Sequence, residues 1–120
     1  MPMKNVKRLP KFREWMESIK DAKTLAIISA NIRKLERGIG DIEPVGEGVS
    51  EVRIDHGPGY RLYFGELGGE VILLLSGGTK KRQQADIDEA KSIFKDLKKR
   101  AAANAAARSD GKAAAKTKEK

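Results

Sequence analysis

Cysteine is absent from the 120 residues of the chain, and histidine occurs once, as His56. The sequence therefore excludes disulfides, thiolate metal sites, cysteine nucleophiles and any site that needs two histidines of one chain. No apolar run approaches the roughly 18 residues of a membrane span. The charged N-terminus also lacks the apolar stretch of a signal peptide. We expect a cytoplasmic protein with no membrane partner, no metal and no cofactor.

Charge, in contrast, is abundant and mostly of one sign. The chain has 25 Lys and Arg residues against 17 Asp and Glu residues, which gives a formal net charge of +8. Such an excess favours a polyanionic partner, either nucleic acid, an anionic membrane surface or an acidic protein. A solvated surface that happens to be basic is compatible with the same composition.

Apolar residues recur at helical spacing in the first and last parts of the chain. They predict a helix over residues 10–20 and a second helix that ends at Gly38, joined as an antiparallel hairpin near Asp21. A short strand at Met3–Arg8 precedes the hairpin. A third helix is predicted after the basic cluster Lys80–Arg82, with acidic residues early and basic residues late in it, as suits the helix dipole.

Glycine marks the middle of the chain, where eleven of the twelve glycines lie between Gly38 and Gly78. Three strands separated by glycine-containing turns are predicted there, at residues 49–55, 60–65 and 70–75. Two such turns in succession indicate a three-strand antiparallel meander. The sequence thus predicts an α+β domain over residues 1–100: a short N-terminal strand, a helical hairpin, the meander and a C-terminal helix.

The last segment, residues 101–120, consists mainly of alanine and lysine. Its first residues are expected to prolong the third helix until Ser109, Asp110 and Gly111 end it. The remainder has nothing to bury and is expected to be disordered.

Alternation along the first two strands of the meander places Glu51, Arg53, Arg61 and Tyr63 on one face of the sheet. Arginine can hold a phosphate with two parallel hydrogen bonds, and an aromatic ring can stack on an unpaired base. The face therefore suggests a phosphate-binding site, where a ribose 2′-hydroxyl could attack its own 3′-phosphate while cations stabilise the developing charge. Cross-strand ion pairs on a solvated sheet face are the alternative interpretation of the same residues.

Several motifs resemble one protein family over residues 10–97. They are GEGVSEVRID at residues 46–55, GPGYRLYF at residues 57–64, and LLSGG at residues 74–78 with Lys80, Gln83 and Asp86-Ile87 after it. The chain is similar in these motifs to the HigB-like addiction-module killer proteins of the RelE/ParE superfamily, which are toxins of type II toxin–antitoxin systems.

This resemblance implies a RelE-like fold with the element order given above. It implies an mRNA interferase, an endoribonuclease that cleaves mRNA, often on the ribosome. The expected partners are a cognate antitoxin, mRNA and the ribosome, with operator DNA reached only through the antitoxin. The residues that match the family's active site are Arg61 for transition-state stabilisation, Arg53 for the phosphate or the 2′-hydroxyl, Lys80 as a further cation, and Tyr63 as an aromatic participant.

Three further residues, Lys81, Arg82 and Gln83, are expected to bind RNA. Glu51 stands where RNA-cleaving relatives carry a second basic residue, and either Glu51 or Tyr63 is a candidate for proton transfer. The last helix lacks the tyrosine that some relatives place there.

Two other functions are compatible with the sequence. The same superfamily includes toxins that inhibit DNA gyrase without cutting RNA, and a fold does not fix a function. A non-catalytic nucleic-acid-binding module would also use a basic face and a lysine-rich tail.

Overall fold

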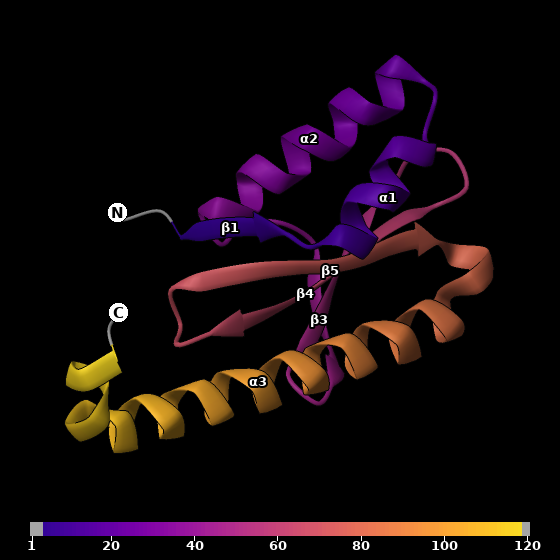
Figure 1. Cartoon of the computed structure of the whole chain (residues 1–120). Coiled ribbons are helices and arrows are strands. Elements are labelled where there is room, and N and C mark those ends of the chain that lie inside the picture. The colour runs from indigo at the N-terminus through magenta and orange to yellow at the C-terminus, as the bar shows by residue number, and fades with distance from the viewer. Residues whose placement is uncertain (1–3, 119–120) are drawn as a thin grey trace.

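A computed structural model of the chain describes the backbone of residues 4–118 and the side chains of residues 4–106. Its centre is a five-stranded mixed sheet with the order β1-β5-β4-β3-β2. Two helices cover one face of the sheet and a long helix covers the other (Figure 1). The elements in chain order are β1 Asn5–Arg8, α1 Pro10–Ser18, α2 Ala22–Glu36, β2 Ile42–Gly46, β3 Val49–Ile54, β4 Tyr60–Leu67, β5 Val71–Thr79, the 3₁₀ turn η1 Lys80–Arg82 and α3 Gln83–Lys118.

The helical hairpin is confirmed, with its break where the sequence places it. Pro10 is the first residue of α1, where its missing N–H costs no helical hydrogen bond. Asp21 caps α2, since its carboxylate accepts hydrogen bonds from the backbone N–H and the hydroxyl of Thr24, at 3.0 and 2.6 Å. The chain leaves α2 after Glu36, and Gly38 has the positive φ of +74° that is common just beyond a helix.

The meander has four strands, so the prediction of three was wrong by one. The additional strand β2 pairs with β3 at the edge of the sheet. Its sequence is short, lacks alternation and contains Pro44, which an edge strand tolerates because one side of the strand needs no backbone donor. A tight turn joins β2 to β3, where Gly46, Glu47 and Gly48 all have positive φ.

The N-terminal strand is confirmed over Asn5–Arg8 and is parallel to β5, whereas Met3 lies outside the described residues. The expected end of the last helix near Ser109–Gly111 was wrong, because α3 continues to Lys118 and the segment expected to be disordered is helical as far as that residue. Residues 119–120 lie outside the described backbone. None of the described helices has the length and apolarity needed to cross a membrane.

Two apolar cores lie on opposite faces of the sheet. Phe12 of α1 and Ile28 and Ile32 of α2 are buried against one face. The other face packs against Ile87 and Phe94 of α3. The apolar periodicity of the sequence therefore identified true core faces in all three helices.

A bulge in β5 decides which residues face α3 near the C-terminal end of this strand. Tyr63 of β4 pairs with Ser76, but the next residue of β4, Phe64, pairs with Leu74, so Leu75 is an extra residue on β5. A bulge of this kind shifts the alternation of the strand by one position. As a result Ser76 lies opposite Tyr63 on the side of α3.

The two glycines that follow the bulge allow close contacts on opposite sides of the sheet. A Cβ atom on Gly77 would overlap the indole ring of Trp15 in α1, and one on Gly78 would overlap the carboxylate of Asp86 in α3. These two residues are therefore glycines because a helix side chain occupies the space that their own side chains would need.

Gly65 offers a test of the packing between β4 and α3. A Cβ atom at this position would lie 2.7 Å from two ring carbons of Phe94, and the backbone conformation of Gly65 is one that alanine adopts freely. We expect Gly65→Ala to lower the free energy of unfolding by about 1–3 kcal/mol, measured by urea denaturation, because the ring must move. The same substitution in a Phe94→Leu background should cost clearly less. An equal loss of unfolding free energy in both backgrounds would show that the ring of Phe94 is not what excludes a side chain at Gly65.

Candidate functional site

Two rows of paired residues, most of them polar, cross three neighbouring strands on the face toward α3. The arginine row consists of Arg53 on β3, Arg61 on β4 and Gly78 on β5, which are paired across the sheet. The glutamate row lies one position pair further along and consists of Glu51, Tyr63 and Ser76. The prediction that Glu51, Arg53, Arg61 and Tyr63 share one face is thereby confirmed.

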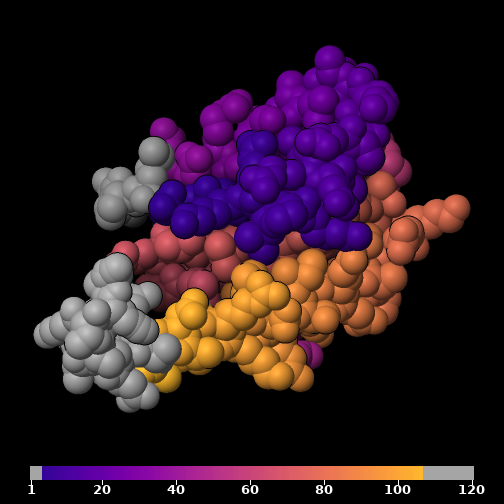
Figure 2. Space-filling model, in the orientation of Figure 1, coloured from indigo at the N-terminus to yellow at the C-terminus, as the bar shows by residue number. Residues whose placement is uncertain are grey.

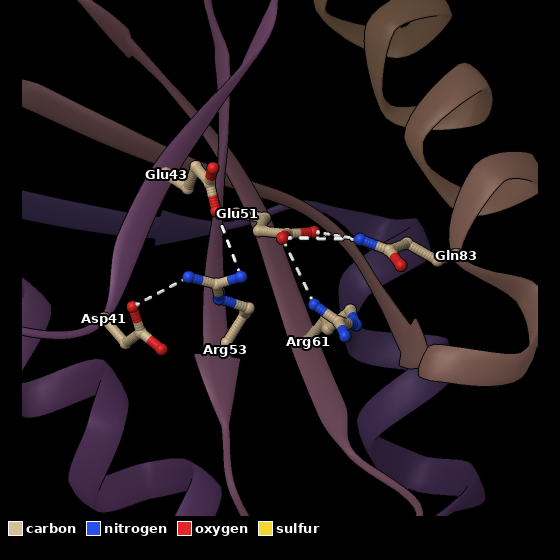
Figure 3. A network of polar contacts seen from close by, with 6 residues as sticks. All are labelled: Asp41, Glu43, Glu51, Arg53, Arg61 and Gln83. Carbon is tan, nitrogen blue, oxygen red and sulfur yellow. Dashed lines mark hydrogen bonds and ion pairs between the residues drawn. The ribbon is translucent and has the colours of Figure 1, made fainter.

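At the centre of these rows Glu51 holds the guanidinium group of Arg61. Nη1 of Arg61 lies 3.1 Å from Oε2 of Glu51, and the two side chains are only 11% and 3% exposed. The amide of Gln83, in the first turn of α3, donates to the same carboxylate at 3.1 Å (Figure 3). Gln83 was expected to bind RNA, but in this structure its amide group helps to fix Glu51. An arginine held in this way keeps one orientation, because its acceptor is itself fixed.

Arg53 has a different environment, although it is the direct neighbour of Arg61 in the arginine row. Its guanidinium group pairs with Asp41 at 3.3 Å and with Glu43 at 3.1 Å, and all three side chains are about half exposed (Figure 3). The hydrogen bond from Arg53 to Asp41 and the charges of both carboxylates raise the pKa of Arg53 above its ordinary value. The cross-strand ion pairs that sequence reasoning kept as an alternative are thus present, with partners on and beside β2.

Tyr63 is fully buried, so its ring is not available on the surface to stack on a base. Its hydroxyl, the hydroxyl of Ser76 and Nε of Arg61 have no hydrogen-bond partner within the described residues. These three atoms all belong to the two rows. Buried polar atoms without partners are uncommon in proteins and often mark a place where water, a ligand or a reacting group binds.

Asp86 of α3 lies next to the arginine row, above its β5 member. Its carboxylate lies over Gly78, the strand partner of Arg61, and the residue is only 7% exposed. Burial is the main cause that raises the pKa of Asp86 above its ordinary value, and the positive charges of Arg82 and Lys11 oppose this shift. Sequence reasoning treated Asp86 only as part of a motif and as a helix-dipole partner.

The basic cluster is placed where the sequence predicts it, between β5 and α3. Lys80, Lys81 and Arg82 form η1 and are exposed. The backbone N–H of Lys80 donates to the carbonyl of Gly59, so the cluster lies beside the turn that precedes Arg61. No ion pair involves these three side chains within the described residues, in contrast to Arg53 and Arg61.

The structure thus joins Glu51, Arg61 and Gln83 in one hydrogen-bonded network. Tyr63 is the strand partner of Glu51, but its hydroxyl has no partner within the described residues, and Arg53 and the basic cluster lie around the network. Sequence reasoning missed Asp41 and Glu43 because it did not predict β2, which brings them to Arg53. It missed Ser76 because only the bulge turns this side chain toward α3. In the described part of the chain, no three Asp, Glu or His side chains converge as a metal ion would require.

We expect Glu51→Gln and Asp41→Asn to differ in cost, although each removes one carboxylate charge from an arginine. The loss of Glu51 leaves the guanidinium group of Arg61 charged and nearly dry, which should lower the free energy of unfolding by about 3 kcal/mol. The loss of Asp41 affects an exposed pair and should cost less than about 1 kcal/mol. Urea unfolding of both variants measures the difference, and similar costs would show that the Glu51–Arg61 pair is not effectively buried.

Tyr63→Phe tests the buried hydroxyl through its pH dependence. Burial is the main cause that raises the pKa of Tyr63 above its ordinary value, and the nearby carboxylates of Glu51 and Asp86 add to the shift. The unfolded chain therefore releases this proton at a lower pH than the folded protein. Stability from Tyr63 is thus complete below about pH 10 and is lost as the pH rises above that value.

At neutral pH we expect Tyr63→Phe to change the free energy of unfolding by no more than about 1 kcal/mol, because the hydroxyl has no partner to lose. Above about pH 10 the variant should lose less stability than the wild type. Urea unfolding at neutral and alkaline pH measures both effects. Parallel losses in the two proteins would mean that the phenol of Tyr63 ionises as easily in the folded state as in the unfolded chain.

Comparison with known proteins finds similarity both in sequence and in structure. No protein-family model matches the sequence. The crystal structure of the toxin–antitoxin complex RelBE2 from Mycobacterium tuberculosis contains a chain that is 17% identical, with a TM-score of 0.49, and the match covers 67% of this chain and all of that one. An uncharacterized protein of Haemophilus influenzae is 40% identical over 87 residues, which make up 72% of this chain and 88% of the relative. The chain belongs to the same protein family as this Haemophilus influenzae protein.

Proposed function

We propose that the chain is the toxin of a type II toxin–antitoxin module and acts as an endoribonuclease on mRNA. The observation that carries this proposal is the fixed guanidinium group of Arg61, which lies on one sheet face beside Arg53 and close to an exposed basic cluster. The motifs that resemble HigB-like killer proteins contain these same residues. Residues 1–100 would form the toxin domain.

The reaction we propose uses the RNA itself, the side chains of this face and water as the carrier of protons. The 2′-oxygen of a ribose attacks the adjacent phosphorus and loses its proton to water, while the bond from phosphorus to the 5′-oxygen breaks and that oxygen takes up a proton from water. The products are a 2′,3′-cyclic phosphate and a 5′-hydroxyl. Arg61 stabilises the negative charge that grows on the phosphoryl oxygens, and its fixed position avoids reorientation during the reaction.

The other residues of the face have supporting roles in this scheme. Glu51 and Gln83 hold Arg61 in position, and Lys80 contributes a second cation at the end of β5. Lys81 and Arg82 bind the RNA backbone. Tyr63 stays neutral, because its raised pKa disfavours the phenolate, so its buried hydroxyl can donate a hydrogen bond but does not serve as a base.

Arg53 must exchange partners before it can bind a phosphate, because Asp41 and Glu43 already occupy it. Exposed ion pairs of this kind contribute little free energy, so a polyanion can displace the carboxylates. An antitoxin would keep the toxin silent, and operator DNA would be bound through the antitoxin. We propose the ribosome as the place where the mRNA is presented.

Arg61→Lys is the decisive variant for the nuclease. It keeps a positive charge next to Glu51 but loses the two-pronged donor geometry of the guanidinium group. We expect a folded protein whose cleavage of a translated message falls by about 100-fold or more, measured by primer extension with purified protein and ribosomes. Arg100→Ala, which removes an exposed arginine of α3 far from the rows, should cleave normally.

Cleavage by Arg61→Lys at the wild-type rate would contradict the assigned role of Arg61. A wild-type protein that is toxic in cells yet cuts no RNA, with or without ribosomes, would contradict the nuclease. The ion pairs that neutralise Arg53 and Arg61 favour one alternative in that event, a toxin of similar fold that inhibits a protein target such as DNA gyrase. DNA damage alongside intact RNA in expressing cells would identify this second candidate.

A further inference from the structure

A cleft of about 300 Å³ opens at the β5 end of the two rows, where Ser76 of the glutamate row and Asp86 form part of its lining. The strand β1 covers β5 only as far as Leu74, so the last residues of β5 form a free edge between α1 and α3. Figure 2 shows α1 in indigo directly above α3 in orange on this side of the molecule. Lys11 of α1 and Glu89 of α3 pair at 3.2 Å and connect the two helices across the cleft.

The walls of the cleft combine an aromatic ring with buried polar groups. Trp15 contributes an indole ring, which packs over Gly77. Ser76 contributes a hydroxyl that is buried and has no hydrogen-bond partner. Asp86 contributes a carboxylate that is almost buried and has no hydrogen bond or ion pair within the described residues. Two acceptors without partners next to an aromatic ring form a site for a flat ligand that carries N–H donors.

The charges at the cleft argue against a phosphate as the group that enters it. Three carboxylates line the cleft, those of Glu14, Asp86 and Glu89, against the two cations of Lys11 and Arg82. Asp86 is the most buried of these groups, so an anion that reached the bottom of the cleft would meet its carboxylate. Arg82 and Lys11 are more exposed and suit a phosphate at the mouth.

We propose that this cleft binds a guanine base of the RNA substrate, with Asp86 as the residue that determines the specificity. Guanine carries two neighbouring donors on its Watson–Crick edge, N1–H and the 2-amino group, and one carboxylate can accept from both. Adenine, cytosine and uracil do not present two adjacent donors. The ring of Trp15 offers a stacking surface, and Ser76 offers an additional hydrogen-bonding group.

The position of the cleft connects it to the proposed cleavage site, so this inference rests on the proposed function. Asp86 lies over Gly78, and Gly78 is the strand partner of Arg61. A base held by Asp86 would therefore lie at the strand next to that of the arginine that we assign to the scissile phosphate. The cleft would set which nucleotide next to the cut is accepted.

Trp15 provides a direct assay, because it is the sole tryptophan of the chain. We expect guanosine 5′-monophosphate to change its fluorescence and to bind about tenfold or more tightly than the adenosine, cytidine and uridine monophosphates. Asp86→Asn should remove this preference, since the amide places donors against the donors of guanine. Asp88→Asn is the matched control, because it makes the same change on an exposed residue of the same helix. Thermal melts establish that both variants are folded, and Ser76→Ala should weaken binding of guanosine 5′-monophosphate less than Asp86→Asn does.

Equal binding of all four nucleotides would overturn the proposal, because it would indicate recognition of the phosphate by the exposed cations. The absence of any fluorescence change at millimolar nucleotide would overturn it as well. The nuclease is tested separately by the Arg61→Lys assay: cleavage without a base preference removes the guanine site alone. Selective binding of guanosine 5′-monophosphate without cleavage of RNA supports the site and removes the nuclease.

Discussion

Arg61 and Glu51 form a charged pair at a place where neither side chain has much contact with water. A buried pair of this kind is costly to form and more costly to break, because one partner left alone keeps an unscreened charge. The arrangement of α3 over the sheet is tied to this pair, since Gln83 at the start of the helix donates to the same carboxylate. The start of α3 in turn places Asp86 over Gly78 and the basic cluster beside β4. The start of the helix and the chemistry of the face are therefore coupled through one interaction.

The two arginines of the arginine row look equivalent in the sequence but differ in burial in the folded chain. Both alternate onto the same face and both pair with carboxylates. Arg61 is held in a nearly dry network and keeps a fixed orientation, whereas Arg53 lies half exposed between two carboxylates that a polyanion can replace. Fixed and exchangeable cations have different uses: the first suits stabilisation of a transition state, and the second suits capture of a phosphate backbone. The proposed nuclease uses both.

Close approach of helix side chains to the sheet explains several residues that have no charge at all. Gly65, Gly77 and Gly78 each leave room for a side chain of α1 or α3. The bulge in β5 places Ser76 and Gly78 on the face of the sheet toward α3. The cleft between α1 and α3 exists because β1 ends before β5 does. The bulge in β5 thus completes the rows of polar residues, and the early end of β1 leaves the free edge beside them.

The sequence by itself determined the α+β class, the order of the helices and most strands, and the common face of Glu51, Arg53, Arg61 and Tyr63. It could do so because apolar periodicity and strand alternation are local and have fixed geometry. Only the tertiary structure decided which of these side chains are buried, that β2 brings Asp41 and Glu43 to Arg53, and that a bulge turns Ser76 inward. Those outcomes depend on contacts between segments far apart in the chain. They also depend on the edge strand β2 and on the extra residue Leu75 in β5, neither of which produces a periodic pattern in the sequence. Electrostatic environment and accessibility are properties of such contacts, which is why they appear only in the folded chain.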